Sequence, residues 1–354
     1  MSTKWNDILI RKALNDTGVT PYTGGTWTNS PDIIPNGTLV EPNPQQAFGA
    51  KTYNADVGKP TIFMQQNYFY VRGKNLSSGA DAGKIYLYYC PQNLFLFPSL
   101  WSQNQLKTSS HQDYVQVVAN DVNEVTVTPE PFTFLPTSET HSCLIARVST
   151  PNHPNPLPQD GEIGTMAQLA NYIASHPNMG WRNVALVNKG IPSYTNYFTL
   201  DTTCLKPGTE YLFLVGLSYK GLTPGSILAF SSGTPIPSGP DKGVVIQHPP
   251  TPVDQADGSF GTRYLTIPAG FKTSVSFTYT AKPPIQQGWS LQFFAVYLPL
   301  QAAANSDDQT ARDLAIPVHE HGIPGLDLNH PLLRLAPNGI VPGIKLGDVS
   351  LIGQ

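Results

Sequence analysis

Two histidines separated by one residue belong to the cluster of this sequence that is richest in metal-binding side chains. His319-Glu320-His321 is followed closely by Asp327 and His330. On an extended strand, residues i and i+2 point to the same side, so His319 and His321 can share one metal ion there. The sequence therefore offers these two histidines as a candidate metal site, and with it a metal-dependent enzyme as one possible function. The alternative is a solvated polar turn before Gly322.

No other group of residues has the spacing of a catalytic site. The remaining histidines are scattered, and none is paired with both an acid and a nucleophile as a hydrolytic triad requires. The sequence contains neither a phosphate-binding P-loop nor a GxGxxG dinucleotide fingerprint. We therefore predict no catalytic residues, no cofactor and no enzymatic activity, which leaves binding as the expected role.

An aromatic segment is the main candidate for a binding surface. The stretch from Asn93 to Leu100 is unusually apolar for a loop, and exposed apolar patches often contact another protein. We therefore predict that Phe95, Phe97 and Trp101 contact a protein partner or a second copy of this chain. Together with the nearby tyrosines they are also consistent with a carbohydrate-binding module that uses exposed Tyr or Trp, or with residues of a core and its edge.

Composition narrows the class of protein. Charged residues make up 13% of the 354 residues, whereas a soluble protein usually carries about 25%. The chain has 34 prolines and 30 glycines, and its 31 Phe and Tyr residues supply material for a core. These features are typical of a β-rich protein with many turns. The net charge of −3, with no dense group of basic residues beyond Arg11-Lys12, argues against binding to nucleic acid.

Short strand patterns separated by turn signals run through most of the chain. For example, Thr273 to Tyr279 alternates small polar with apolar residues, as a half-buried strand does. Helical spacing occurs only in the first fifteen residues and between Glu162 and Ser175. The expected fold is all-β, with two immunoglobulin-like sandwich modules, one short inserted helix and a short N-terminal helix. The expected division is a Pro-rich wrapping segment with that N-terminal helix (1–60), a first sandwich (61–203) and a second sandwich with a C-terminal tail (204–354).

Export signals and cysteines bear on where the protein works. No run approaches the roughly 18 apolar residues of a membrane helix, and the first residues lack the apolar stretch of a Sec signal peptide. Cys90, Cys143 and Cys204 are an odd number at wide spacing, which favours reduced structural cysteines in a protein made in the cytoplasm. A single Cys90–Cys143 bridge across a sandwich is the alternative.

An ordered set of short motifs resembles a known family. The set comprises Ser30-Pro31-Asp32-Ile33, then Asn67 to Asn75 (NYFYVRGKN), then Lys84 to Tyr89 (KIYLYY), and Trp101. It resembles the immunoglobulin-like, CARDB-like adhesion modules of bacterial proteins over roughly residues 30–200. In such modules these phrases mark strands and turns, so the resemblance implies a fold and no catalytic residues.

The resemblance also implies a kind of biological role. An adhesion-type module in a bacterial protein points to a non-enzymatic, protein-binding or structural function. Without a Sec signal, a component or cargo of a secretion or toxin system, exported by a signal-peptide-independent route, is the expectation. The residues after about position 200 match no family that we can name.

Overall fold

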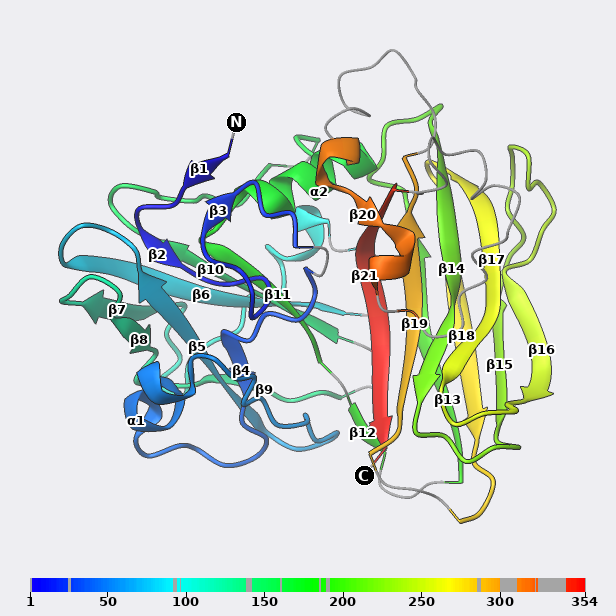
Figure 1. Cartoon of the computed structure of the whole chain (residues 1–354), viewed down its shortest axis with the longest axis horizontal. Coiled ribbons are helices and arrows are strands. Elements are labelled where there is room, and N and C mark those ends of the chain that lie inside the picture. The colour runs from blue at the N-terminus through cyan, green and yellow to red at the C-terminus, as the bar shows by residue number, and fades with distance from the viewer. Residues whose placement is uncertain are drawn as a thin grey trace. The chain divides into compact units, whose positions relative to one another are not determined.

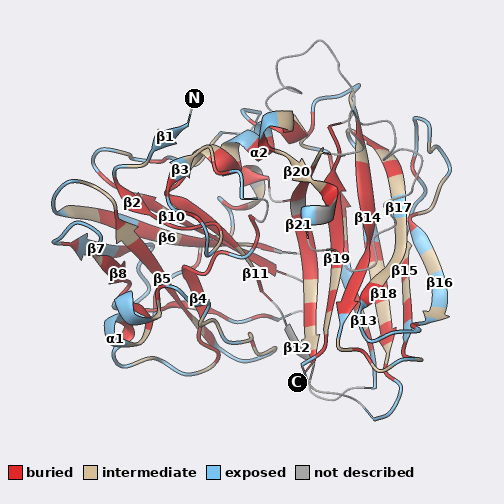
Figure 2. Cartoon of the chain, viewed as in Figure 1, coloured by how far each residue is buried: buried red, intermediate tan, exposed pale blue. Residues whose placement is uncertain are grey.

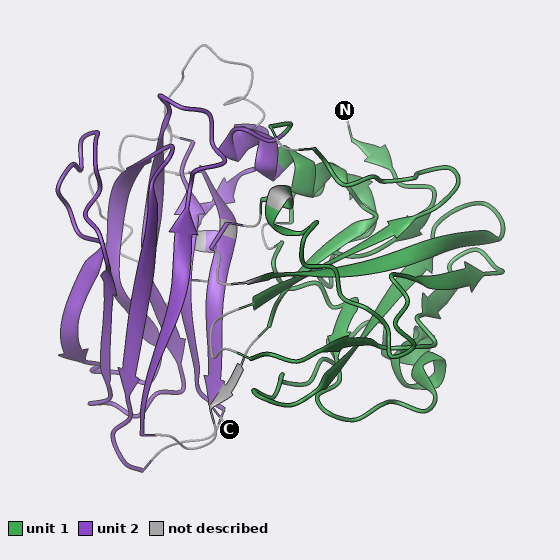
Figure 3. Ribbon diagram, turned by 180° about the vertical axis from the view of Figure 1, so that it is seen from behind, with its two compact units in different colours: residues 1–91, 97–162, 171–184 green, residues 92–96, 163–170, 185–354 purple. Residues whose placement is uncertain are grey.

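The computed structural model confirms the all-β class, because strands form nearly all of its regular structure (Figure 1). The structure describes residues 2–24, 27–91, 94–95, 97–137, 142–159, 161–184, 186–188, 192–284, 288–299, 311–321, 323 and 342–353. The chain divides into two compact units (Figure 3). Unit 1 comprises residues 1–91, 97–162 and 171–184, and unit 2 comprises residues 92–96, 163–170 and 185–354.

Unit 1 contains two main antiparallel sheets. The first has the strand order β11-β10-β6-β7, formed by Met179–Val184, Ser142–Ser149, Asp81–Pro91 and Val115–Ala119. The second is built around β5 (Asn67–Asn75), which pairs along its length with β2 (Ile8–Leu9), β4 (Ile33–Pro35), β8 (Val125–Val127) and β9 (Phe132–Phe134). A two-stranded ribbon (β1, Thr3–Lys4; β3, Val19–Thr20) and three short helices (α1, Pro44–Phe48; η1, Ala50–Thr52; η2, Pro98–Leu100) complete the unit.

The core of unit 1 lies between these two sheets. One sheet contributes Leu87 and Leu144, and the other contributes Phe69 and Val71, all of them fully buried in a single hydrophobic cluster. Burial of this kind is the main force that holds a sandwich together.

Unit 2 is also a sandwich of two sheets. One has the order β12-β21-β19-β14-β17, with β20 attached to β21; its strands are Leu186–Asn188, Pro342–Gly353, Ser290–Tyr297, Glu210–Lys220, Gly258–Pro268 and Ile316–Pro317. The other has the order β13-β18-β15-β16; its strands are Ser193–Asp201, Lys272–Thr280, Ile227–Ser232 and Gln247–Pro252. The ring of Phe293 on β19 lies 4.6 Å from that of Phe198 and 5.5 Å from that of Phe230, so aromatic packing joins the two sheets.

The N-terminal helix predicted from the sequence is wrong. Residues 3–4 and 8–9 are strands, and Ile8 and Leu9 pair with Asn75 and Lys74 of β5. The helical reading required one apolar face, yet every residue from Ile8 to Lys12 is buried. An extended segment enclosed on both sides satisfies that pattern, whereas a surface helix does not.

The inserted helix predicted between Glu162 and Ser175 is confirmed as α2 (Met166–Ser175), which begins four residues later than predicted. The apolar residues that recur at helical spacing are buried: Ile163, just before the helix, and Met166, Leu169, Ala170 and Ile173 within it. Its first half belongs to unit 2 and its second half to unit 1. Strand β13 also belongs to unit 2, although the sequence division placed it in the first sandwich.

Strand β16 (Gln247–Pro252) is unusually rich in proline for a strand. It contains Pro249, Pro250 and Pro252 and pairs only with β15, at the edge of its sheet. Proline has no amide hydrogen to donate, so sheets accept it at an edge, where one side of the strand needs no ladder bonds. The strand is also largely exposed, as Figure 2 shows.

Candidate functional site

The premise of the histidine metal site is wrong. His319 and His321 lie in a 3₁₀ helix, η3 (Val318–His321), instead of an extended strand. A 3₁₀ helix has three residues per turn, so the i, i+2 spacing does not place two residues on one side as it does in a strand. Asp327 and His330 lie outside the described residues, and within the described residues no group of three or more His, Cys, Asp or Glu is arranged to hold a metal ion.

His321 has a packing role in this arrangement. Its Nε2 atom lies 2.9 Å from the carbonyl oxygen of Gly343 on β21, which assigns the proton to Nε2 in the neutral ring. Burial lowers the pKa of His321 to about 4, so the ring is neutral at physiological pH. The neutral His321 imidazole therefore connects η3 to β21 by donating a hydrogen bond to the Gly343 carbonyl oxygen.

The predicted partner-binding aromatic residues are buried. Phe95, Phe97 and Trp101 are each at most 1% exposed. The Phe95 ring lies 5.2 Å from that of Phe213, and the Trp101 ring lies 5.5 Å from that of Trp181. Because a partner cannot contact a side chain that has no accessible surface, the prediction that these three residues form a contact surface is wrong. The alternative reading, in which they belong to the core, describes them correctly.

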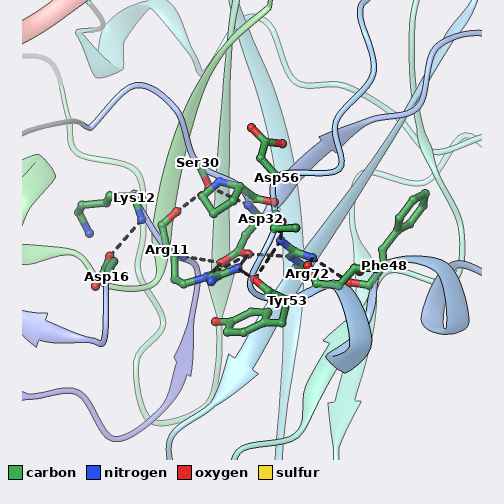
Figure 4. Close-up of polar contacts among 12 residues, drawn as sticks. Arg11, Lys12, Asp16, Ser30, Asp32, Phe48, Tyr53, Asp56 and Arg72 are labelled. Atoms are coloured by element: carbon green, nitrogen blue, oxygen red, sulfur yellow. Dashed lines mark hydrogen bonds and ion pairs between the residues drawn. The ribbon is translucent and has the colours of Figure 1, made fainter. Parts of the chain in front are cut away.

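Two residues of the family-like motifs meet in a buried ion-pair network in unit 1 (Figure 4). Asp32 Oδ1 lies 2.8 Å from Nε of Arg72 and 2.6 Å from Nη2 of Arg11. All three residues are at most 2% exposed. The Arg11 guanidinium also stacks over the Tyr53 ring at 3.4 Å. Burial by itself would lower the pKa of Arg11, but the hydrogen bond and charge of Asp32 outweigh it and raise that pKa.

The remaining donors of Arg72 are satisfied by the backbone. Its Nη atoms donate to carbonyl oxygens of Phe48, Pro31 and Ala55 at 2.8–3.1 Å. The Arg72 guanidinium thus holds the segment that precedes β5 against that strand, although this segment has little regular structure of its own. The motif residues therefore stabilise the fold and are inaccessible to a ligand.

A second group of titratable side chains joins three parts of unit 1. The Asp7 carboxylate accepts hydrogen bonds from Thr150 Oγ1 at 2.5 Å and lies 2.6 Å from Nδ1 of His153. The carboxyl group of Asp81, at the start of β6, interacts electrostatically with that of Asp7, and its buried Oδ2 atom has no hydrogen-bond partner in the described structure. Burial, followed by the interaction with Asp7, raises the pKa of Asp81 to about 6.

This pair makes the stability of unit 1 depend on pH. Since the pKa of Asp81 is raised from 3.8 to about 6 by folding, the native state binds more protons than the unfolded state between these values. Stability should therefore fall as the pH rises from about 4 to about 6. We expect Asp81→Asn, which keeps the size of the side chain without its charge, to raise Tm relative to the wild type at pH 7.5 and to have little effect at pH 4.5.

Thermal unfolding of the two proteins at both pH values measures this effect. Asp81→Ala serves as the control: it removes the charge and also the Oδ1 atom that accepts a hydrogen bond from the Ala82 amide, so it should lower Tm at pH 4.5. An equal Tm difference between Asp81→Asn and the wild type at both pH values would show that the ionisation of Asp81 is not linked to folding.

The surface best suited to binding is the outer face of the β13-β18-β15-β16 sheet in unit 2. We define it by eight of the outward residues of the three strands β13, β18 and β15: Thr195, Tyr197, Thr199, Ser274, Ser276, Thr278, Ala229 and Ser231. Each of these side chains is partly or fully exposed, and Tyr197 is 51% exposed. The intervening residues of the same strands are buried in the sandwich. Period-two alternation therefore produces one apolar inner face and one hydroxyl-rich outer face.

Strand register arranges the outer face in rows. Tyr197 lies opposite Ser276, which lies opposite Ser231, and the latter lies opposite Gln247 of β16. In the adjacent row, the hydroxyls of Thr195 and Thr278 are 3.2 Å apart. None of the eight defining residues is charged, whereas the same side of β18 also carries Lys272, whose side chain is 62% exposed and whose Nζ lies 2.8 Å from Asp201 Oδ2 of β13.

A recess of about 420 Å³ lies on the β16 side of the outer face. Its polar lining residues are Ser231, Ser276, Thr278, Gln247 and His248, and its apolar lining comes from Ala229, Phe230, Pro249 and Pro250. The His248 ring is supported by Phe260, whose ring centre is 4.2 Å away. The recess can therefore offer hydrogen bonds to an uncharged ligand, and no charged side chain lines it.

The sequence predicts strand β18, which carries three of the eight residues of the outer face, but it does not predict that this face is a binding surface. The alternation in Thr273–Tyr279 predicts an outer polar side. The rows across β13, β18 and β15 depend on pairings between residues 43 to 87 positions apart, which the pattern of a single strand does not reveal. In the part of the chain that the structure describes, no helix is long and apolar enough to span a membrane.

Comparisons with known proteins give no family. No family model matches the sequence, and no curated protein matches it. Among solved structures, the secreted serine protease VesC from Vibrio cholerae matches at 8% identity over 65% of this chain and 46% of its own, with a TM-score of 0.23. Red sea bream transglutaminase matches at 10% identity over 68% of this chain and 28% of its own, with a TM-score of 0.21.

A bacterial surface protein is also among the matches. The collagen-binding domain of RspB from Erysipelothrix rhusiopathiae has 8% identity over 82% of this chain and 93% of its own, with a TM-score of 0.16. The chain spans less than half of the first two proteins. At such TM-scores these similarities assign neither a family nor a function, and they do not confirm the CARDB-like resemblance.

Proposed function

We propose that this protein is a non-enzymatic binding protein that contacts a protein partner through the outer face of unit 2. The observation that carries the proposal is an open sheet face whose eight defining residues are uncharged and present a 51% exposed tyrosine among serine and threonine hydroxyls. Tyrosine contributes a large rigid contact area at low entropic cost, and small hydroxyl residues supply adaptable hydrogen bonds, as in antibody paratopes. Depletion of charge is likewise typical of the centre of a protein interface.

Site-specific photocrosslinking tests this proposal. A benzoylphenylalanine at position 197 should crosslink the partner in extracts or cells of the source organism. The same probe at Val118, a 49% exposed position on β7 of unit 1, is the matched control and should not. Ser276→Arg, which places a charge in the middle of the outer face, should abolish the crosslink from position 197, whereas Val118→Arg should leave it unchanged. Equal crosslinking from positions 197 and 118 would contradict the assignment of the surface.

Carbohydrate binding is the second candidate, and the recess favours it. Hydroxyl, amide and imidazole groups beside proline and phenylalanine carbon suit the alternating polar and apolar surface of an uncharged sugar ring. The same variants separate the two candidates. Binding to a neutral glycan on an array that Ser276→Arg abolishes would assign the face to carbohydrate, and a silent array together with a protein crosslink would assign it to a protein.

The proposal also includes the biological system in which the protein works. The motifs that resemble bacterial adhesion modules support a role as a component or cargo of a secretion or toxin system. Genes for such a system beside the coding gene in the source genome would support this setting, and an unrelated neighbourhood would remove its basis.

A further inference from the structure

Two of the three cysteines are direct cross-strand neighbours in unit 1. Cys90 on β6 and Cys143 on β10 are register partners in an antiparallel ladder that continues from Ser142–Pro91 to Ser149–Lys84. The bridge considered from the sequence would have joined the two layers of a sandwich, whereas the structure places both residues in one sheet. Both are thiols and are at most 2% exposed.

The spacing of such neighbours suits a disulfide. Directly opposed residues in an antiparallel pair have Cα atoms about 4.5 to 5.5 Å apart. Disulfides form across Cα separations of about 4.4 to 6.8 Å. Directly opposed residues also project their side chains from the same face of the sheet, so no strand needs to shift for the two sulfur atoms to meet.

We propose that Cys90 and Cys143 form a reversible cross-strand disulfide, with a small-molecule disulfide such as oxidised glutathione as the oxidant. One cysteine thiolate attacks a sulfur of oxidised glutathione, which forms a mixed disulfide and releases one glutathione thiolate. The other cysteine thiolate attacks the protein sulfur of that mixed disulfide, which forms the Cys90–Cys143 bond and releases the second glutathione. The protein loses two electrons and two protons, and oxidised glutathione gains both as two thiols.

The cysteine pair lies near the ends of two strands, where local opening can admit a small-molecule oxidant. Cys90 is one residue from the end of β6, and Cys143 is one residue from the start of β10, so both lie at the end of the ladder. Strand ends open locally more readily than strand centres. On the other side of Cys143, its thiol donates a hydrogen bond to Asn183 Oδ1 at 3.0 Å on β11. That contact orients the Cys143 side chain and is given up when the disulfide forms.

The disulfide would stabilise unit 1 under oxidising conditions only. It would fasten the end of the β6–β10 ladder and close the chain between residues 90 and 143 into a covalent loop, which restricts the unfolded state. Cys204 has a different setting: it lies in unit 2, in the connection between β13 and β14. It therefore serves as the internal control.

Equilibration with glutathione buffers tests the proposal on the full chain. Reduced protein is incubated with oxidised glutathione, quenched with acid, and its thiols are counted in denaturant. We expect the count to fall from three to one, the mass to fall by two hydrogens, and a peptide containing Cys90 to be linked to one containing Cys143. Reductant should restore all three thiols, and Tm should be higher in the oxidised form.

Single cysteine variants distinguish a Cys90–Cys143 disulfide from other pairings. Cys204→Ser should still form the linked peptide, and Cys90→Ser should not. If Cys90→Ser fails to fold, the peptide map of the wild-type protein decides by itself. Three thiols after equilibration, including a sample opened with sub-denaturing urea, would overturn the proposal. A linkage that includes Cys204, or glutathione adducts without a protein disulfide, would also overturn it.

Discussion

Replacing Asp32 by asparagine should destabilise unit 1 by about 3–5 kcal/mol, because it removes the only carboxylate that contacts the Arg11 and Arg72 guanidinium groups in the described network. Asparagine has the same size but no charge, so two buried cations would remain without a counter-charge. The cost arises from leaving them uncompensated and does not measure what the pair adds over an apolar core. We also expect the segment from Phe48 to Ala55 to loosen, because Arg72 holds its carbonyl groups while Asp32 orients Arg72.

Urea unfolding followed by 19F NMR of 5-fluorotryptophan can measure this loss in unit 1 separately. Trp27, Trp101 and Trp181 report on unit 1, and Trp289 reports on unit 2. The matched control is Asp113→Asn, since the Lys107–Asp113 ion pair has side chains 58% and 60% exposed. Its loss should cost less than about 1 kcal/mol. Equal effects of the two substitutions would show that the Asp32 network contributes no more than a surface ion pair.

Phe293→Ala should cost unit 2 about 3–5 kcal/mol of unfolding free energy, the usual cost of removing a large aromatic side chain from a core. Phe293 is fully buried on β19, and its ring packs against Phe198 and Phe230 of the facing sheet. The substitution would leave a cavity between the two sheets at the point where their aromatic rings meet. The inner face would then support the outer face less firmly, although no outer residue has changed.

The Trp289 resonance in the same urea titration measures this prediction. Ser274→Ala on the exposed side of β18 is the control, and we expect a change below about 0.5 kcal/mol. A loss as small as that of Ser274→Ala would mean that Phe293 does not join the sheets of unit 2. Retention of the Trp27, Trp101 and Trp181 midpoints would show that unit 1 unfolds independently.

The sequence alone determined the class of fold and many of its elements. Low charge, frequent turn residues and period-two alternation predict an all-β chain, and the structure confirms it. Helix α2 was also predictable, because its inner residues recur at helical spacing over more than two turns. These features are local: each pattern is complete within a dozen residues, so no knowledge of distant contacts is needed to recognise it.

The motifs that resemble adhesion modules show that long-range contacts cannot be predicted from local sequence patterns. The sequence places Asp32 and Arg72 in motifs that resemble strands and turns of adhesion modules. It does not reveal that these two residues, 40 positions apart, form an ion pair. The same limit explains the N-terminal segment. Ile8 and Leu9 fit helical spacing, and only their pairing with β5 makes the extended form more favourable.

Only the tertiary structure decided which side chains face solvent. Phe95, Phe97 and Trp101 have the composition of a contact surface, yet packing partners elsewhere in the chain cover them. Conversely, the outer face of unit 2 is made of ordinary serine, threonine and tyrosine residues, and it becomes a surface through the register of three strands. Alternation along one strand establishes that one side is buried, whereas the pairing of distant strands determines which residues lie together on the side that remains open.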